Sequence, residues 1–226
     1  QLAPSATRGA NQLSESMAQY SAYMVLKEYY GEAVMQKFLT YELDDYLSGR
    51  ANESKFEKTL LDNDTQSYVW YEKGGIILYA LQDYIGADSL NRAFSKLLDE
   101  FALKEEPPFA TTWDWYQYMD AATPDSLKYY LEDSFKKITL YENKAKKAVL
   151  TPISETETEV TLTVDTRKVY YDGSGKESGE GTQPNLLEIG ISAKDSKNEG
   201  GFTQKEPLYL QKHWLSTGAH SLTYTV

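Results

Sequence analysis

The sequence predicts an α+β fold, with a helical subdomain over residues 1–140 followed by an antiparallel β-sandwich over residues 141–226. Two observations lead to this prediction. Up to about Tyr141, apolar residues recur at intervals of three and four, as they do on one face of a helix. Beyond Tyr141 they alternate with polar residues, as they do in strands that bury one face. Helices and strands that occupy separate parts of a chain are typical of the α+β class.

The first part of the chain is expected to hold six helices. The first helix starts at Leu13, is apolar on most faces as buried helices are, and is interrupted at Gly31. Five further apolar stripes predict helices around residues 34–47, 68–84, 90–101, 113–119 and 124–138. We expect Thr123 to cap the last of these, with Pro124 at its first position.

The second part of the chain contains alternating runs around residues 160–164, 187–191, 208–210 and 222–226. Asp172-Gly173 is a turn signal between two of them, so a sheet of hairpins with one buried face is expected. The last run still alternates at Val226, and we therefore expect the natural chain to continue beyond it.

Composition excludes some kinds of partner and site. The chain has 226 residues, 41% of them hydrophobic, which suits one or two globular domains with a core. A net charge of -11 repels phosphates and argues against a nucleic-acid partner. The absence of cysteine excludes disulfides and thiolate metal ligands.

Glu15 is the first candidate site residue. It lies in the first turn of a helix that is otherwise apolar, within Ser14-Glu15-Ser16-Met17-Ala18-Gln19-Tyr20. A carboxylate there needs a partner or a neutral state. Either the helix N-terminus stabilises it through the helix dipole, or it binds a metal ion.

Tyr71 is the second candidate, within Tyr71-Glu72-Lys73-Gly74. Gly74 and Gly75 fall inside the predicted helix, where each costs about 1 kcal/mol relative to alanine. The close approach of a neighbouring backbone or of a ligand would offset this cost. Tyr71 is then either a half-buried aromatic residue or part of a site.

Together, the two segments resemble the aminopeptidase N family of zinc peptidases, the gluzincins with an HExxH motif. The resemblance implies a helical end of a catalytic domain followed by a β-sandwich. It implies that Glu15 is a zinc ligand and that the Tyr71 hydroxyl stabilises the oxyanion while N-terminal residues are removed from a peptide substrate. The chain is also similar to bacterial peptidase-like domains fused to transporter permease segments, which implies a membrane-associated parent protein.

The chain departs from the family in several ways. Its histidines, His213 and His220, do not form an HExxH motif; the G-x-M-E-N element is missing; and Ser16 stands where the family usually has glycine. We therefore expect a fragment that begins downstream of HExxH, is inactive alone, binds no zinc tightly and self-associates through uncovered helix faces. The alternative is a non-catalytic peptidase-like binding or accessory module of a membrane transport protein, which the Ser16 mismatch favours.

Overall fold

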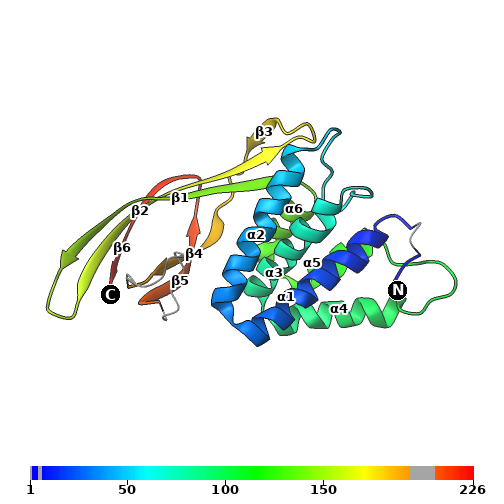
Figure 1. The fold of residues 1–226 in the computed structure, drawn as a ribbon, viewed down its shortest axis with the longest axis horizontal. Coiled ribbons are helices and arrows are strands. Elements are labelled where there is room, and N and C mark those ends of the chain that lie inside the picture. Colours follow the sequence, from blue (N-terminus) through cyan, green and yellow to red (C-terminus); the bar gives the residue numbers. More distant parts are fainter. Residues whose placement is uncertain (1, 5–6, 194–206) are drawn as a thin grey trace. The chain divides into compact units, whose positions relative to one another are not determined.

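The computed structural model describes residues 2–4, 7–193 and 207–226 (Figure 1). The chain forms two compact units. Unit 1 consists of Gln1–Ile138 and Asp172–Lys176, and unit 2 consists of Thr139–Tyr171 and Glu177–Val226. Helices make up unit 1 and antiparallel strands make up unit 2, which confirms the predicted α+β class.

The described part of unit 1 contains six α-helices and three short helical segments of other types. The α-helices are α1 (Met17–Tyr30), α2 (Glu32–Ala51), α3 (Gly74–Ile85), α4 (Ala87–Phe101), α5 (Thr112–Ala122) and α6 (Lys128–Phe135). The π-helical segments are η1 (Gln12–Ser16) and η2 (Val69–Lys73), and the 3₁₀ segment is η3 (Asp125–Leu127). None of the helices in the described residues is both long and apolar enough to cross a bilayer.

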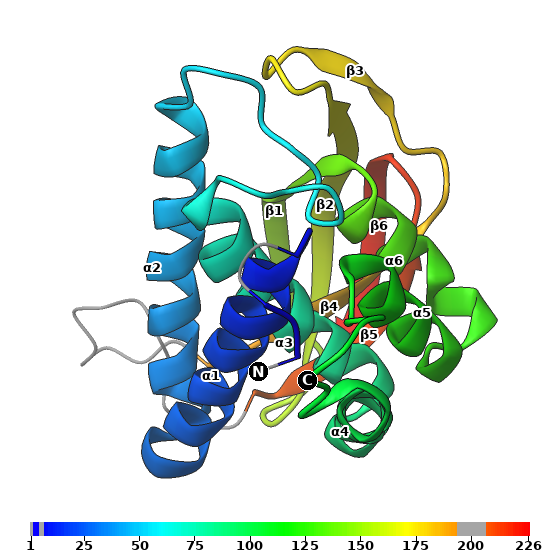
Figure 2. The same ribbon diagram turned by 90° about the vertical axis from the view of Figure 1, so that its right-hand side faces the viewer.

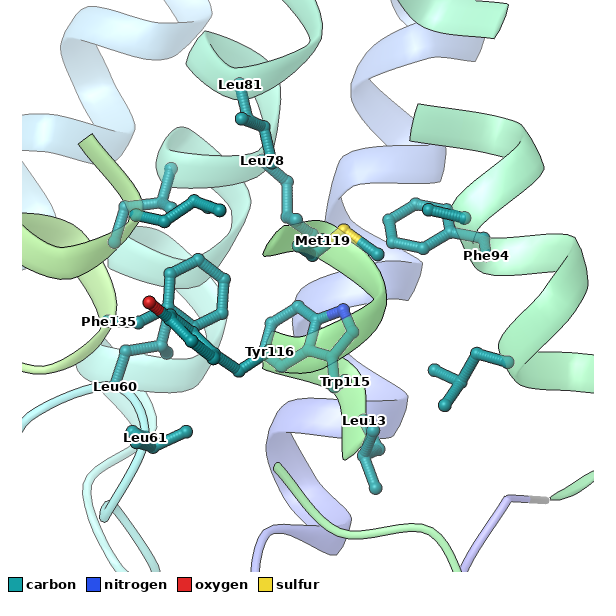
Figure 3. Packing of buried hydrophobic residues seen from close by; sticks show 14 of the residues in the cluster. Leu13, Leu60, Leu61, Leu78, Leu81, Phe94, Trp115, Tyr116, Met119 and Phe135 are labelled. Atoms are coloured by element: carbon teal, nitrogen blue, oxygen red, sulfur yellow. The ribbon is translucent and has the colours of Figure 1, made fainter. Parts of the chain in front are cut away.

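The core of unit 1 gathers around Trp115 of α5, which is fully buried (Figure 3). Its ring meets that of Phe135 edge to face, with the ring centroids 5.0 Å apart. Helix α5 starts with a capping box in which Thr111 and Asp114 each bind the other's backbone N–H. This cap fixes the residue at which α5 begins, and so determines that the Trp115 side chain lies on the buried face of α5.

Two expectations for the helices were wrong. Helix α1 buries Tyr20 and Tyr23 but leaves Val25 54% exposed, because neighbouring helices cover only part of its surface. Thr123 does not cap the last helix. It ends α5 instead, where its hydroxyl donates a hydrogen bond of 2.7 Å to the carbonyl of Met119, and η3 begins after Pro124.

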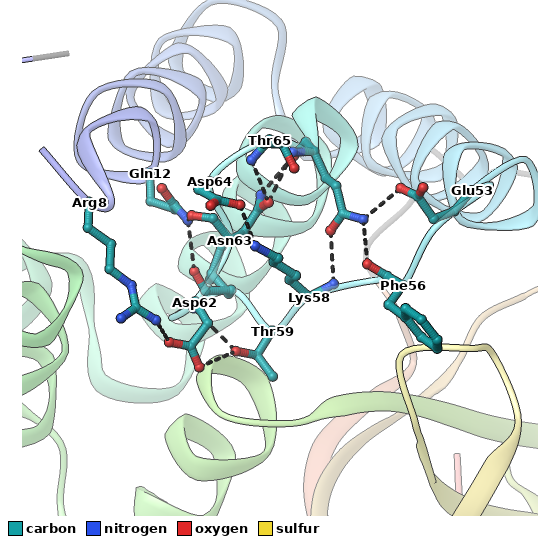
Figure 4. Close-up of polar contacts among 12 residues, drawn as sticks. Arg8, Gln12, Glu53, Phe56, Lys58, Thr59, Asp62, Asn63, Asp64 and Thr65 are labelled. Atoms are coloured by element: carbon teal, nitrogen blue, oxygen red, sulfur yellow. Dashed lines mark hydrogen bonds and ion pairs between the residues drawn. The ribbon is translucent and has the colours of Figure 1, made fainter. Parts of the chain in front are cut away.

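The segment between α2 and η2 is irregular but held by side-chain hydrogen bonds to its backbone (Figure 4). The Gln66 side chain donates to the carbonyl of Phe56 at 2.9 Å and accepts from the N–H of Lys58 at 2.8 Å. The buried Gln12 amide donates to the carbonyl of Leu60 at 3.2 Å. These bonds satisfy backbone groups that no helix or sheet pairs, so the segment has a defined path.

The described part of unit 2 contains two sheets. The strands are β1 (Ile138–Pro152), β2 (Thr158–Tyr171), β3 (Glu177–Glu180), β4 (Asn185–Ile191), β5 (Tyr209–Leu215) and β6 (Gly218–Thr225). Strand β2 pairs with β1, β3 and β6 in the larger sheet, and β4 pairs with β5 in the smaller one. The β2–β6 register runs from Glu159–Thr225 to Thr166–Gly218.

The alternating runs correspond to β2, β4, β5 and β6, and the turn at Asp172-Gly173 connects β2 to β3. Strand β1 was not recognised as a separate strand, because almost all of it is exposed and its sequence does not alternate. The inward face of β5 was predicted wrongly. Leu208 and Leu210 are 58% and 51% exposed, whereas Tyr209 and His213 are partly buried.

Candidate functional site

Glu15 and Tyr71 both lie in π-helical segments, η1 and η2, that lead into α1 and α3. Helices α1 and α3 pack against each other, and Figure 2 shows them side by side. A π-helical turn interrupts the regular hydrogen bonding of an α-helix and is frequently found at functional sites. Two such turns in contact therefore mark this place in unit 1 as a candidate site.

The structure brings the two predicted site residues together. The neighbouring Glu15 carboxylate is the main cause that raises the pKa of the Tyr71 phenol, because it favours the protonated phenol as a donor over a second negative charge. The Ser14 hydroxyl also donates to Glu15 Oε1, at 3.3 Å. Glu15 is partly buried and Tyr71 is 36% exposed, so a ligand in solution could reach the phenol.

Close packing, rather than a ligand, accounts for the two glycines. A Cβ atom at Gly74 would lie against the side chain of Ser16, only 2.8 Å from its Cβ, and one at Gly75 would lie 2.8 Å from Tyr23. The buried Ser16 hydroxyl donates a hydrogen bond of 2.6 Å to the carbonyl of Trp70. Ser16 thus joins η1 to η2, which gives the serine at this position a structural role.

Replacing Gly74 with alanine is expected to lower the unfolding free energy of unit 1 by about 1–3 kcal/mol through overpacking. In an unobstructed helix the same change would be stabilising by about 1 kcal/mol. The double variant Ser16→Gly/Gly74→Ala should recover much of the loss, because the closest atoms that the new Cβ meets belong to Ser16. Urea denaturation of the two single variants and the double variant measures this coupling, and strictly additive losses would contradict the packing account.

Unit 1 also contains a buried carboxylate, that of Glu57, which pairs with two cationic side chains. Glu57 Oε2 lies 2.7 Å from Arg50 Nε, and Oε1 lies 3.4 Å from Lys73 Nζ and accepts a 2.7 Å hydrogen bond from the Tyr46 hydroxyl. Burial lowers the pKa of Lys73, and the adjacent Glu57 opposes that shift. Sequence reasoning missed this network because Glu57 lies in a polar segment without a periodic pattern.

Further carboxylates lie in the same part of unit 1. Glu42 is 5% exposed and accepts a hydrogen bond from Gln19 Nε2 at 3.1 Å. Burial raises the pKa of Glu72, and the nearby Glu42 and Asp45 raise it further. Glu15 and Glu72 both act on the Tyr71 phenol, so its surroundings are acidic, which favours a cationic ligand over an anionic one.

The described residues do not complete a zinc site. In residues 2–4, 7–193 and 207–226, no three histidine, cysteine, aspartate or glutamate side chains are arranged to hold a metal ion. His213 and His220 have partners inside unit 2, where their Nε2 atoms lie 2.7 Å from Tyr209 Oη and Ser216 O. Glu15 alone would be one ligand of a larger set, so no catalytic step on zinc follows from the described residues by themselves.

Comparison with known proteins adds no further assignment: no protein-family model matches the sequence, and no curated protein matches it.

Proposed function

We propose that unit 1 belongs to the catalytic site of a zinc-dependent peptidase similar to aminopeptidase N, in which Glu15 is one metal ligand and Tyr71 stabilises the oxyanion. The observation that carries this proposal is the contact between η1 and η2, which brings the Tyr71 phenol close enough to the Glu15 carboxylate for the carboxylate to raise its pKa. The two residues come from segments far apart in the sequence, and the proposed chemistry requires them to be neighbours.

In this proposal each side chain has a separate task. Zinc, when bound, polarises the scissile carbonyl and lowers the pKa of its water. Glu15 is partly exposed and offers carboxylate oxygens, which are among the ligands that zinc takes in proteins. The Tyr71 hydroxyl keeps its proton and donates a hydrogen bond to the negative charge that develops on the substrate oxygen. The buried Lys73–Glu57 pair fixes η2 and therefore the position of Tyr71.

We also propose that unit 2 is a small β-sandwich of the kind that follows such a catalytic domain. Strand β5 of the smaller sheet passes into β6 of the larger sheet through the short connection at Ser216-Thr217. The rings of Tyr209 on β5 and Tyr224 on β6 are in contact, with their centroids 4.1 Å apart and their planes tilted by 37°. A contact of this kind supports two sheets that face each other.

Glu15→Gln tests the metal-ligand role in the protein that the proposal implies, in which this chain is joined to an HExxH segment. We expect the unsubstituted protein to hold one zinc ion per molecule and the variant to lose most of it, since the amide is uncharged and binds zinc weakly. Zinc content after dialysis, measured by mass spectrometry, provides the result. Glu28→Gln is the matched control, because Glu28 is an exposed glutamate on the following helix, α1.

Equal zinc in the Glu15→Gln variant and the control would contradict the ligand role of Glu15. A natural protein without zinc in any of its forms would contradict the peptidase itself. It would leave the non-catalytic binding or accessory module, which would be expected to hold peptides even after chelation. The Ser16 mismatch no longer favours that alternative, because Ser16 binds the Trp70 carbonyl.

A further inference from the structure

Two tyrosines and a histidine of unit 2 converge on one point. Tyr209 and His213 lie on β5, and Tyr224 lies on β6. His213 Nε2 is 2.7 Å from Tyr209 Oη and 3.3 Å from Tyr224 Oη. All three side chains are partly buried. One nitrogen and two oxygen donors thus meet outside the candidate peptidase site.

Strand geometry explains the convergence. Tyr209 and His213 are four residues apart on β5 and therefore point to the same face of the strand. The chain turns at Ser216, Thr217 and Gly218, where Gly218 has a φ of 123° that favours glycine. This turn brings Tyr224 of β6 close to Tyr209 of β5, and the two rings lie tilted at 37° to each other.

The separations of the donors match those of ligands on a single metal ion. Neighbouring ligands at about 2.0–2.1 Å from an ion, at right angles to each other, lie about 2.9 Å apart. The separations of 2.7 and 3.3 Å from His213 Nε2 to the two phenol oxygens lie on either side of this value. A cation can therefore replace the hydrogen bonds between the three donors with small movements of the side chains.

We propose that Tyr209, His213 and Tyr224 form a binding site for a ferric ion. Phenolate oxygen is a hard, anionic donor that matches a hard trivalent cation, and imidazole also suits iron. Tyrosine is an established iron ligand in proteins. On binding, the two phenols release their protons to solvent, and the two phenolate charges offset part of the charge of the ion. Water or a small anion completes the coordination.

Titration of the metal-free 226-residue chain with ferric nitrilotriacetate tests this site. We expect one iron per chain and a visible charge-transfer band from phenolate to Fe³⁺. Tyr209→Phe and Tyr224→Phe retain the rings and should preserve the fold, which circular dichroism checks. Each should weaken iron binding by at least about tenfold, the effect of losing even a supporting contact at a metal site.

His220→Gln is the matched control, because His220 lies on β6 and its Nε2 contacts the Ser216 carbonyl instead of the tyrosines. It should leave both the iron content and the visible band unchanged. Three results would overturn the proposal: a chain that takes up no iron, a visible band that persists in both phenylalanine variants, or tighter binding of Zn²⁺ than of Fe³⁺ by the same residues. Each result is independent of peptidase activity.

Discussion

Glu57→Ala is expected to destabilise unit 1 by about 3–5 kcal/mol, because it removes the carboxylate that pairs with the buried Lys73 and with Arg50. The side chains of Glu57, Lys73 and Arg50 are only 2%, 7% and 12% exposed. Water therefore cannot replace the lost carboxylate without opening the structure. The Tyr46 hydroxyl would lose its acceptor as well.

Urea denaturation followed by tryptophan fluorescence measures this loss, since Trp70 and Trp115 both lie in unit 1. Asp64→Ala is the matched control. Asp64 forms an ion pair with Lys58 in the same segment, but their side chains are 51% and 43% exposed. Exposed pairs of this kind contribute about 0–1 kcal/mol. Similar losses in the two variants would contradict the role given to the buried network.

A second substitution separates the charge effect from the packing effect. In Glu57→Gln/Lys73→Met, the glutamine retains an acceptor for Tyr46, and the uncharged methionine replaces the buried ammonium group. We expect this variant to be more stable than Glu57→Gln alone, because removing both charges of a buried pair often costs little. A double variant that is less stable than Glu57→Gln would indicate that Lys73 matters through its packing.

Under the proposed peptidase function, Tyr71→Phe is expected to lower the kcat of peptide hydrolysis by about 10²–10³, the usual effect of removing one donor to an oxyanion. The ring remains, and only the hydroxyl is lost. We therefore expect the zinc content and stability to stay close to those of the unsubstituted protein. Hydrolysis of an aminoacyl anilide, measured at several substrate concentrations, separates kcat from KM.

Tyr29→Phe is the control for this experiment, because Tyr29 is 78% exposed on α1. A reduction confined to Tyr71→Phe supports the proposed role of the phenol. An unchanged kcat would remove Tyr71 from the chemistry, even if Glu15 proved to bind zinc. An increase in KM alone would indicate that the phenol binds the substrate and the transition state equally well.

Much of the fold was predictable because hydrophobic periodicity reports directly on which face of an element is buried. The helices around residues 90–101 and 113–119 correspond to α4 and α5, and the alternation at 160–164 lies in β2. The prediction failed for β1, because an exposed strand does not need alternating residues. It also failed for Thr123, because an N-cap residue type can equally well end the preceding helix.

The candidate site was predictable only in part. Short motifs selected Glu15 and Tyr71, but motifs carry no information about their distance from each other. The structure alone explains why a serine stands at position 16 and a glycine at position 74. These two residues let η1 and η2 approach closely. Glu57 could not be found from the sequence, since its partners Arg50 and Lys73 meet it through tertiary packing.

The sequence by itself determined the α+β class, most helices and strands, and the two residues on which the proposed function rests, because these depend on local periodicity and short motifs. Only the tertiary structure decided which polar groups meet. The Glu15–Tyr71 pair, the buried Glu57 network and the Tyr209–His213–Tyr224 cluster each join different secondary-structure elements. Such contacts depend on how elements pack, which no local pattern in the chain records.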